Sequence, residues 1–170
     1  KEVRKRRDIY KDKPFNRVGI PCFSIVDVFV DIFAYLTAGK DVVLLYPQLP
    51  DERMAGLIAS SDINYITSYK NFYNRDFCTD FSAVLSKPGF RESQDEGDVL
   101  VFSSGTQSLP HAVVLSTKSL CYSAWNGQQM LPCNRYDKLL SILPISHVFG
   151  FVCSFLWPFS QGASIALGHD

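Results

Sequence analysis

A run of small hydroxyl residues around one glycine is the segment of this sequence best suited to chemistry. Residues 102–113 read FSSGTQSLPHAV, and the apolar stretch 99–102 leads directly into them. The hydroxyl groups can donate hydrogen bonds, and the exposed amides of such a loop form a concave nest for phosphate oxygens. The segment is not a Walker loop, because the pattern G-x-x-x-x-G-K-[ST] is absent and no helix is expected directly after it. Composition alone leaves an ordinary polar surface loop as the alternative.

A histidine with aromatic neighbours is the second candidate. His147 lies in the segment 143–150, LPISHVFG, and Phe151 follows it. A general base in a triad would need a nucleophile and an orienting acid, but G-x-S-x-G is absent and no Asp or Cys stands at a diagnostic spacing. We therefore interpret His147 as part of the border of an apolar pocket. The alternative is an aromatic-rich helix in the core.

Other reactive side chains are interpreted as structural. The five cysteines are an odd number without C-x-x-C spacing, which favours reduced buried thiols over disulfides or a zinc site. Asp27, Asp31 and Asp41 could indicate a metal or phosphoacceptor site. However, Asp27 and Asp31 stand four residues apart beside an apolar helical stripe, and the solvated edge of such a stripe is the more common cause.

The charge of the chain is balanced overall but uneven along its length. There are 17 Lys and Arg and 17 Asp and Glu, yet residues 1–20 hold eight basic and three acidic residues. The run 4–7, RKRR, could contact nucleic acid phosphates. No interleaved aromatic residues and no reading helix accompany it. We therefore predict a solvated helix end or tail, and no nucleic acid partner.

The order of expected elements indicates an α/β fold. Strands are expected at residues 18–20, 42–45, 64–67, 82–85, 99–102, 113–115, 139–142 and 163–167. Helices are expected at residues 25–36, 51–60, 117–129 and 148–159. Near-continuous apolar strands alternating with helices predict a layered, mostly parallel sheet with helices on both faces.

The length and hydropathy of the chain restrict its class. The 170 residues, 46% of them hydrophobic, suffice for about one domain with a real core. The apolar stretches 25–36 and 148–159 are shorter than the ~18 residues of a membrane span. The charged N-terminus does not read as a signal peptide. We therefore expect a soluble, cytoplasmic protein without a membrane span.

The polar loop and the histidine segment together resemble a known family. Residues 102–120, FSSGTQSLPHAVVLSTKSL, are similar to the phosphate-loop signature [YF]-T-S-G-T-T-G-x-P-K-G-V-x-L-[ST]-H-x-x-L of the adenylate-forming superfamily. This superfamily contains acyl- and aryl-CoA synthetases, luciferases and adenylation domains. Residues 143–150 resemble its L-P-x-x-H-x-[FY]-G segment, and residues 39–47 and 52–66 resemble its earlier strand and helix–strand pair. The resemblance covers nearly the whole chain with order and spacing kept.

The loop departs from the family pattern at four positions. His111 replaces the lysine, Ser108 and Ala112 replace two glycines, and Gln107 replaces a threonine. An unperturbed imidazole is mostly neutral at pH 7, whereas lysine is charged, and the lost glycines stiffen the loop. We therefore expect weakened binding of a triphosphate, although histidine can still donate a hydrogen bond.

The resemblance implies an acid–CoA ligase of the acyl-CoA synthetase type. Residues 1–170 would form a partial N-terminal AMP-binding domain, with no second domain and an incomplete sheet. In such enzymes a carboxylate attacks the α-phosphate of ATP with Mg²⁺ present, pyrophosphate leaves, and the thiol of CoA or of a carrier protein captures the acyl-adenylate. A histidine in the second motif, where amino-acid-activating members have Asp, favours a fatty or aromatic acid.

The resemblance also implies roles for particular residues. The phosphates of ATP would be bound by Ser103, Ser104, Gly105, Thr106, Gln107, Ser108 and His111. The acid would be bound by His147, Phe149 and Gly150. It implies no catalytic residue and no Mg²⁺ ligand within these 170 residues.

Three hypotheses follow for the function of this 170-residue chain. Family members have several hundred residues, and their Mg²⁺-binding motif, ribose-binding aspartate and mobile lid have no counterpart here. The first hypothesis is therefore that the chain is a ligase fragment without turnover of its own. The second hypothesis is a stand-alone, non-catalytic nucleotide- or acyl-binding module with a degenerate loop. The third, an unrelated phosphate-binding domain, requires both motif matches to be accidental. An open sheet edge also predicts self-association.

Overall fold

The computed structural model describes residues 1–71, 73, 75–87, 95–103 and 111–168. A five-stranded sheet has the order β3-β1-β2-β4-β5, and a second sheet pairs β6 with β7. The strands are β1 (Arg17–Pro21), β2 (Asp41–Leu45), β3 (Tyr65–Ile66), β4 (Val99–Phe102), β5 (Ala112–Leu115), β6 (Lys138–Ser141) and β7 (Ser164–Leu167). All neighbouring strands are parallel except β4 and β5, which form an antiparallel pair. The predicted mostly parallel α/β architecture is confirmed.

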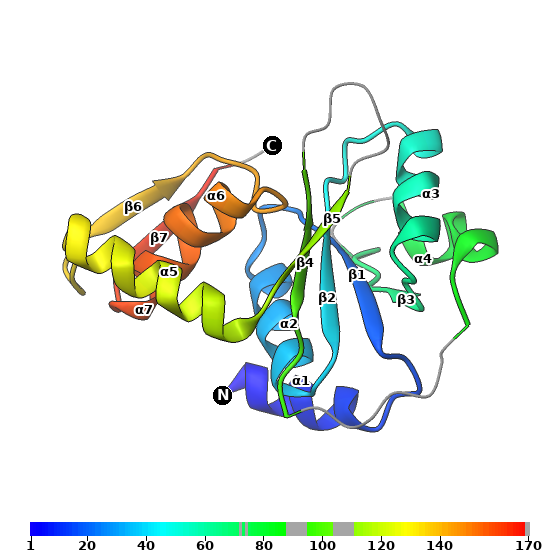
Figure 1. Ribbon diagram of the computed structural model, residues 1–170, viewed down its shortest axis with the longest axis horizontal. Coiled ribbons are helices and arrows are strands. Elements are labelled where there is room, and N and C mark those ends of the chain that lie inside the picture. Colours follow the sequence, from blue (N-terminus) through cyan, green and yellow to red (C-terminus); the bar gives the residue numbers. More distant parts are fainter. Residues whose placement is uncertain (72, 74, 88–94, 104–110, 169–170) are drawn as a thin grey trace.

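The helices cover both faces of the five-stranded sheet. In Figure 1, α2 lies on one side of this sheet and α3 and α4 on the other. The longer helices are α1 (Glu2–Lys11), α2 (Val26–Thr37), α3 (Asp51–Ser60) and α5 (Thr117–Met130). The shorter ones are α4 (Phe77–Asp80), α6 (Val148–Phe151), the π-helical η2 (Val152–Leu156), α7 (Trp157–Ser160) and the 3-10 helix η1 (Ser82–Val84).

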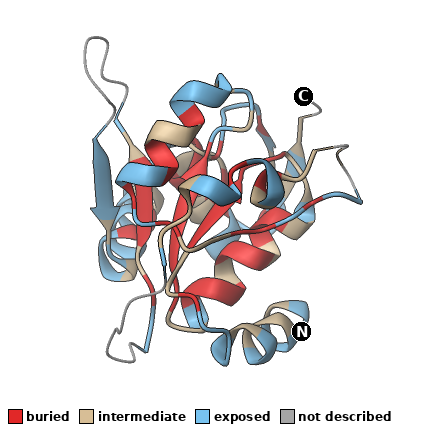
Figure 2. Cartoon of the chain, turned by 90° about the vertical axis from the view of Figure 1, so that its right-hand side faces the viewer, coloured by how far each residue is buried: buried red, intermediate tan, exposed pale blue. Residues whose placement is uncertain are grey.

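The central strands are buried because both faces of the sheet are covered. Every residue of β2 is buried, and so are the first three of β4. Figure 2 shows the buried residues on the central strands and on parts of the helices packed around them. The absence of polar alternation in both strands is the expected sequence pattern for this environment. By contrast, Val113 and Val114 of the edge strand β5 are exposed in the described chain.

An aromatic contact joins the second sheet and its helices to the first. The ring of Phe155 in η2 stacks on Phe29 of α2 with 3.9 Å between centroids, and Phe33 stacks on Phe159 at 5.5 Å. Residues 148–159, expected as one helix, are helical throughout but pass through a π-helical segment before Pro158. Helix α2 is therefore packed between the five-stranded sheet and the helical segment α6–α7.

One expected strand was wrong. Residues 82–85 were expected as a strand, but Ser82–Val84 form a 3-10 helix that directly follows α4. The amide of Val84 donates to the carbonyl oxygen of Phe81 at 3.1 Å, so a local bond replaces the ladder that a strand would need. The basic run 4–7 lies in the first half of helix α1, with Arg4 and Lys5 exposed, which agrees with the predicted solvated helix end.

Arg6 and Asp31 form the ionic contact that holds α1 on α2. Asp31 is only 2% exposed, and its Oδ1 accepts from Arg6 Nη1 at 2.8 Å and from the hydroxyl of Tyr10 at 2.8 Å. Its Oδ2 accepts from the hydroxyl of Tyr69 at 3.1 Å, and Arg6 also pairs with Asp27. The interpretation of Asp31 as part of a solvated edge is therefore wrong. Hydrogen bonds from donors of this kind offset the cost of burying a carboxylate.

Burial and hydrogen bonding act in opposite directions on Arg6. Burial lowers the pKa of the guanidinium, but the hydrogen bonds to Asp31 and Asp27 outweigh this and raise the pKa above its ordinary value. Asp41, the third acid of the set, is also buried and is placed by Arg17, whose Nη2 lies 3.2 Å from Asp41 Oδ2. These acids therefore orient elements of the fold. No helix among the described residues is long and apolar enough to span a membrane.

Candidate functional site

The polar loop predicted to bind phosphate begins and ends on the β4–β5 hairpin. The two strands pair in the register Val99↔Leu115 to Phe102↔Ala112. One step beyond, the amide of Ser103 donates to the carbonyl oxygen of His111 at 3.0 Å, and both residues are exposed. The ends of the loop are therefore held side by side. The predicted phosphate-binding residues Ser104, Gly105, Thr106, Gln107 and Ser108 lie outside the described residues.

The loop begins at the edge of the sheet where ligands of α/β proteins are usually bound. Strand β4 is parallel to β2, and β2 is parallel to β1, so their carboxyl ends lie at one edge. This edge faces upward in Figure 1. Open parallel sheets bind ligands in the crevice outside the carboxyl ends of their strands. Ser103 and His111 therefore lie at a favourable place for a nucleotide.

A crevice at the same edge separates the two sheets. Its volume is 170 Å³, and its walls come from residues that follow β1 and β2 on one side and β6 and β7 on the other. Cys22, Ser24 and Tyr46 belong to the first wall, and Ser141 and Pro144 belong to the second. The segment that leaves β6 forms this wall and continues directly to His147. The crevice thus lies between the ends of two parallel sheets.

His147 begins helix α6, and its side chain caps that helix. The imidazole Nδ1 accepts a hydrogen bond from the amide of Phe149 at 3.2 Å. His147 is exposed, and Phe149 is 56% exposed, whereas Phe151 is 1% exposed. Gly150 is buried, and a Cβ atom there would lie 2.2 Å from the carbonyl oxygen of Pro144. The first turn of α6 is therefore pressed against the segment that lines the crevice.

The crevice lies next to the predicted segment 143–150, but one of its walls was not predicted from the sequence. The lining residues of the second motif lie just before His147, at positions 141–145. Cys22, Ser24 and Tyr46 were not selected at all. Their position directly after the buried strands β1 and β2 is the signal that could have identified them, because it is the carboxyl edge of a parallel sheet.

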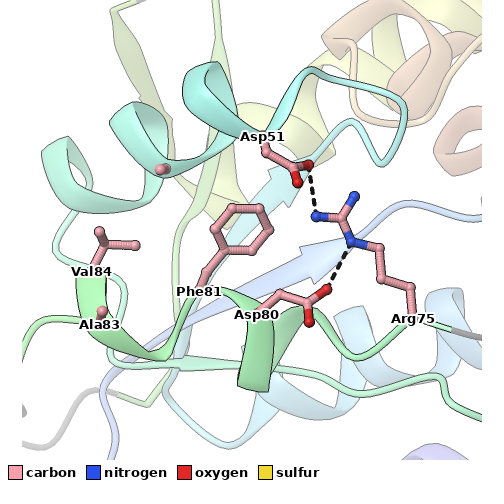
Figure 3. A pocket seen from close by; sticks show the side chains of 7 residues that line it. Asp51, Arg75, Asp80, Phe81, Ala83 and Val84 are labelled. Atoms are coloured by element: carbon pink, nitrogen blue, oxygen red, sulfur yellow. Dashed lines mark hydrogen bonds and ion pairs between the residues drawn. The ribbon is translucent and has the colours of Figure 1, made fainter.

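A larger, open hollow lies on the other side of the sheet, beside α3 and α4. Its volume is 550 Å³, and Figure 3 shows Arg75 between Asp51 and Asp80 at its rim. Arg75 Nη2 lies 2.7 Å from Asp51 Oδ1, and Arg75 Nε lies 2.8 Å from Asp80 Oδ2. The guanidinium also lies over the rings of Phe77 and Phe81. We interpret this arrangement as a structural clamp between α3 and α4.

Replacing Arg75 with alanine is expected to lower the free energy of unfolding by about 1 kcal/mol. The two ion pairs are partly exposed and contribute little, and the contact with the rings adds about 0.5–1 kcal/mol. Urea denaturation of the 170-residue chain would measure the change, with Arg53→Ala on the exposed side of α3 as the control. A loss above about 3 kcal/mol would show that a buried network depends on Arg75, contrary to this interpretation.

Comparison with sequence models of protein families shows whether the chain is related to the adenylate-forming superfamily or is an unrelated phosphate-binding domain. The sequence model of the family described as "AMP-binding enzyme" matches residues 12–170. This chain belongs to the AMP-binding enzyme family. The resemblance to the adenylate-forming superfamily, of the acyl-CoA synthetase type, is thereby confirmed. The hypothesis of an unrelated phosphate-binding domain is wrong.

Relatives of this AMP-binding chain include CoA ligases. It is 34% identical over 173 residues to a CoA ligase of Gibberella moniliformis, covering 88% of this chain and 28% of that protein. It is 33% identical over 105 residues to 4-coumarate–CoA ligase 3 of Arabidopsis thaliana, covering 54% of this chain and 18% of that protein. The AMP-binding chain therefore spans less than a third of the length of either relative.

Solved structures show the same fold. The o-succinylbenzoate–CoA synthetase of Bacillus subtilis, in complex with its acyl-adenylate intermediate, superimposes with a TM-score of 0.78 at 15% identity. The match covers 99% of the AMP-binding chain and 47% of that protein. The same synthetase has been solved with ATP and a magnesium ion. In the described part of the AMP-binding chain, no three His, Cys, Asp or Glu side chains are grouped to hold a metal ion.

Proposed function

We propose that this chain is part of an ATP-dependent acid–CoA ligase that activates a fatty or aromatic carboxylate as its acyl-adenylate. The observation on which the proposal rests is that the phosphate-type hairpin and the crevice between the sheets open at one edge of the fold. The family match and the related CoA ligases support the reaction class. A nucleotide at the hairpin would lie beside an acid bound between the sheets.

The proposed reaction has two balanced steps. A carboxylate oxygen of the acid attacks the α-phosphorus of ATP, and the bond to the leaving pyrophosphate breaks. The thiol of CoA, or of a carrier protein, then attacks the acyl carbon and releases AMP. Catalysis of this kind depends mainly on positioning and on stabilising charge at phosphorus.

The residues of this chain would act on the pyrophosphate side of ATP. The hydroxyl of Ser103 and the imidazole of His111 lie at the two ends of the loop and can donate hydrogen bonds to phosphate oxygens. The solved structure of the Bacillus subtilis o-succinylbenzoate–CoA synthetase with ATP and a magnesium ion supports the use of Mg-ATP.

Restoring lysine at position 111 is expected to lower the KM for ATP about tenfold. The main-chain oxygen of His111, and not its imidazole, makes the hydrogen bond to Ser103, and the residue is exposed, so the substitution requires no repacking. A charged donor to a phosphate contributes about 1.5–3 kcal/mol, and 1.4 kcal/mol corresponds to tenfold. Acid-dependent ATP–pyrophosphate exchange by the full-length protein would measure it.

The matched control for this experiment is Lys118→Gln. Lys118 is exposed on α5, beyond the hairpin, and its loss is expected to leave the KM for ATP unchanged. An unchanged KM in His111→Lys, alone and together with Ala112→Gly, would contradict the assignment of the loop to the phosphates. It would leave the hypothesis of a non-catalytic module with a degenerate loop as the better account.

We also propose that residues 1–170 do not turn over by themselves. They cover 28% of the related CoA ligase of Gibberella moniliformis, and the resemblance places the ribose-binding aspartate and the lid lysine outside them. Acid-dependent release of AMP by the isolated chain would contradict this. The absence of release, together with exchange by the full-length protein, is the expected result.

A further inference from the structure

The exposed side of helix α1 is strongly basic. Residues 1–13 hold seven Lys and Arg and three Asp and Glu, whereas the rest of the chain holds ten and fourteen. We propose that this side of α1 binds the surface of a membrane that contains anionic phospholipids, so that the protein attaches to the membrane peripherally. This inference is independent of the proposed acid–CoA ligase function.

The inner side of α1 is occupied by its contact with α2. Arg6 Nη1 lies 2.8 Å from Asp31 Oδ1, and the ring of Tyr10 stacks on that of Tyr35 with 4.0 Å between their centroids. An ion pair and a ring stack one turn further along the helix fix the rotation of α1 about its axis. These contacts therefore determine which residues α1 presents to the solvent.

The outer side of α1 presents cations that no acid of the helix neutralises. Arg4 and Lys11 lie two turns apart on this side, with Lys5 beside Arg4, and all three residues are exposed. None of these three forms an ion pair with any residue that the structure describes. Both acids of the helix already pair with arginines of the same helix. The outer side is therefore free to attract an external anionic surface.

Helix α1 lies far from the edge of the sheet proposed to bind the nucleotide. Strand β1 begins shortly after α1, and Lys40 Nζ, directly before β2, donates to the carbonyl oxygen of Lys13 at 3.0 Å. The end of α1 is thus held at the amino ends of these strands. In Figure 1, α1 lies at the bottom of the molecule and the carboxyl edge faces upward. A membrane bound at α1 would leave the nucleotide edge accessible.

The composition of the outer side favours lipid headgroups over a nucleic acid. Residues 1–13 contain six basic residues besides Arg6, and clusters of about four to eight basic residues on a helix are typical of binding to anionic lipids. Tyr10 is the only aromatic residue of α1, and its ring is stacked on Tyr35, so no ring of α1 is free to stack on a base. Ile9, which is 52% exposed, adds an apolar contact that suits the interfacial region of a bilayer.

The mode of binding follows from the burial of the apolar side of α1. Because that side packs on α2, the helix would lie on the headgroups and would not enter the acyl chains. The attraction would be mainly electrostatic, and added salt should weaken it by screening. Since the rest of the chain has more acidic than basic residues, only one orientation of the protein brings its positive side to the membrane.

Co-sedimentation of the full-length protein with lipid vesicles tests this proposal. We expect binding to vesicles of phosphatidylcholine with phosphatidylserine, and no binding to vesicles of phosphatidylcholine alone. Each basic residue near an anionic surface strengthens binding about fivefold, so Arg4→Gln together with Lys5→Gln should weaken it about 25-fold. Arg4→Lys together with Lys5→Arg keeps both charges and should bind like the wild type.

The matched control is Arg53→Gln together with Lys138→Gln. This pair removes the same two charges from exposed positions on α3 and β6 and should leave vesicle binding unchanged. Binding that does not require phosphatidylserine, no binding at all, or equal weakening by both charge-removing pairs would overturn the proposal. Stronger binding to duplex DNA or to polyglutamate than to the anionic vesicles would overturn the assignment to lipid. Pyrophosphate exchange tests the ligase function separately, so the two failures are distinguishable.

Discussion

Replacing Arg6 with alanine is expected to lower the free energy of unfolding of the chain by about 3 kcal/mol. The substitution leaves the buried carboxylate of Asp31 without its cationic partner, while Tyr10 and Tyr69 still donate to it. Removing one partner of a buried ion pair costs about 3–5 kcal/mol, and we take the lower end because the Arg6 side chain is 23% exposed. Thermal denaturation should show a Tm lower by roughly 6–12 °C.

The neighbouring Arg7 provides the control for Arg6. Its guanidinium pairs with Asp8 at 2.7 Å on the exposed side of α1, so Arg7→Ala should cost less than about 0.5 kcal/mol. The double variant Arg6→Ala with Asp31→Asn should recover part of the loss, because it removes the unpaired charge. Equal stability of Arg6→Ala and Arg7→Ala would show that the ionic contact does not hold α1 in place.

The second large effect is expected for Gly150→Ala, which should destabilise the fold by about 2–3 kcal/mol and raise the KM for the acid. The new Cβ would lie 2.2 Å from the carbonyl oxygen of Pro144 and 3.1 Å from that of Leu143. Both atoms belong to the main chain, which cannot move aside as a flexible side chain can, and overpacking costs about 1–3 kcal/mol. Because Pro144 and Leu143 line the crevice, their displacement should change its shape.

Gly127→Ala is the matched glycine control. Its Cβ would lie 3.2 Å from the ring of Trp157, a side chain that can shift by a few tenths of an ångström. In the interior of α5 the change also gains about 0.5–1 kcal/mol of helix propensity, so the net effect on stability should be near zero. Denaturation curves and exchange kinetics would compare the two variants. A Gly150→Ala protein with unchanged stability and KM would contradict the described packing of α6.

Most of the fold could be predicted because its signals are local. The uninterrupted apolar residues of β2 and β4 indicate strands covered on both faces, and the period of α2 indicates one buried side. The hairpin ends at Ser103 and His111 follow from a strand, a polar loop and a second strand in succession. These patterns depend on neighbours in the sequence, so one chain is enough to detect them.

Two of the three features that were missed depend on residues distant in the sequence. Arg6 in α1 pairs with Asp31 in α2, 25 positions later in the sequence. Considered within its own helix, each charged residue would be expected on the solvent-exposed face. The crevice combines residues after β1 and β2 with residues after β6, about a hundred positions later. Residues 82–85 have the composition of a strand, but α4 ends two residues earlier and a local helical bond forms instead. Tertiary contacts thus decide the first two outcomes, and a local hydrogen bond decides the third.

The most direct test of the account is acid-dependent ATP–pyrophosphate exchange by the full-length protein, measured over acetate, benzoate, cinnamate and dodecanoate. We expect exchange that requires both Mg-ATP and a fatty or aromatic acid. We also expect a lower KM for ATP in His111→Lys. A full-length protein that binds ATP but exchanges pyrophosphate with none of these acids would contradict the proposed carboxylate activation.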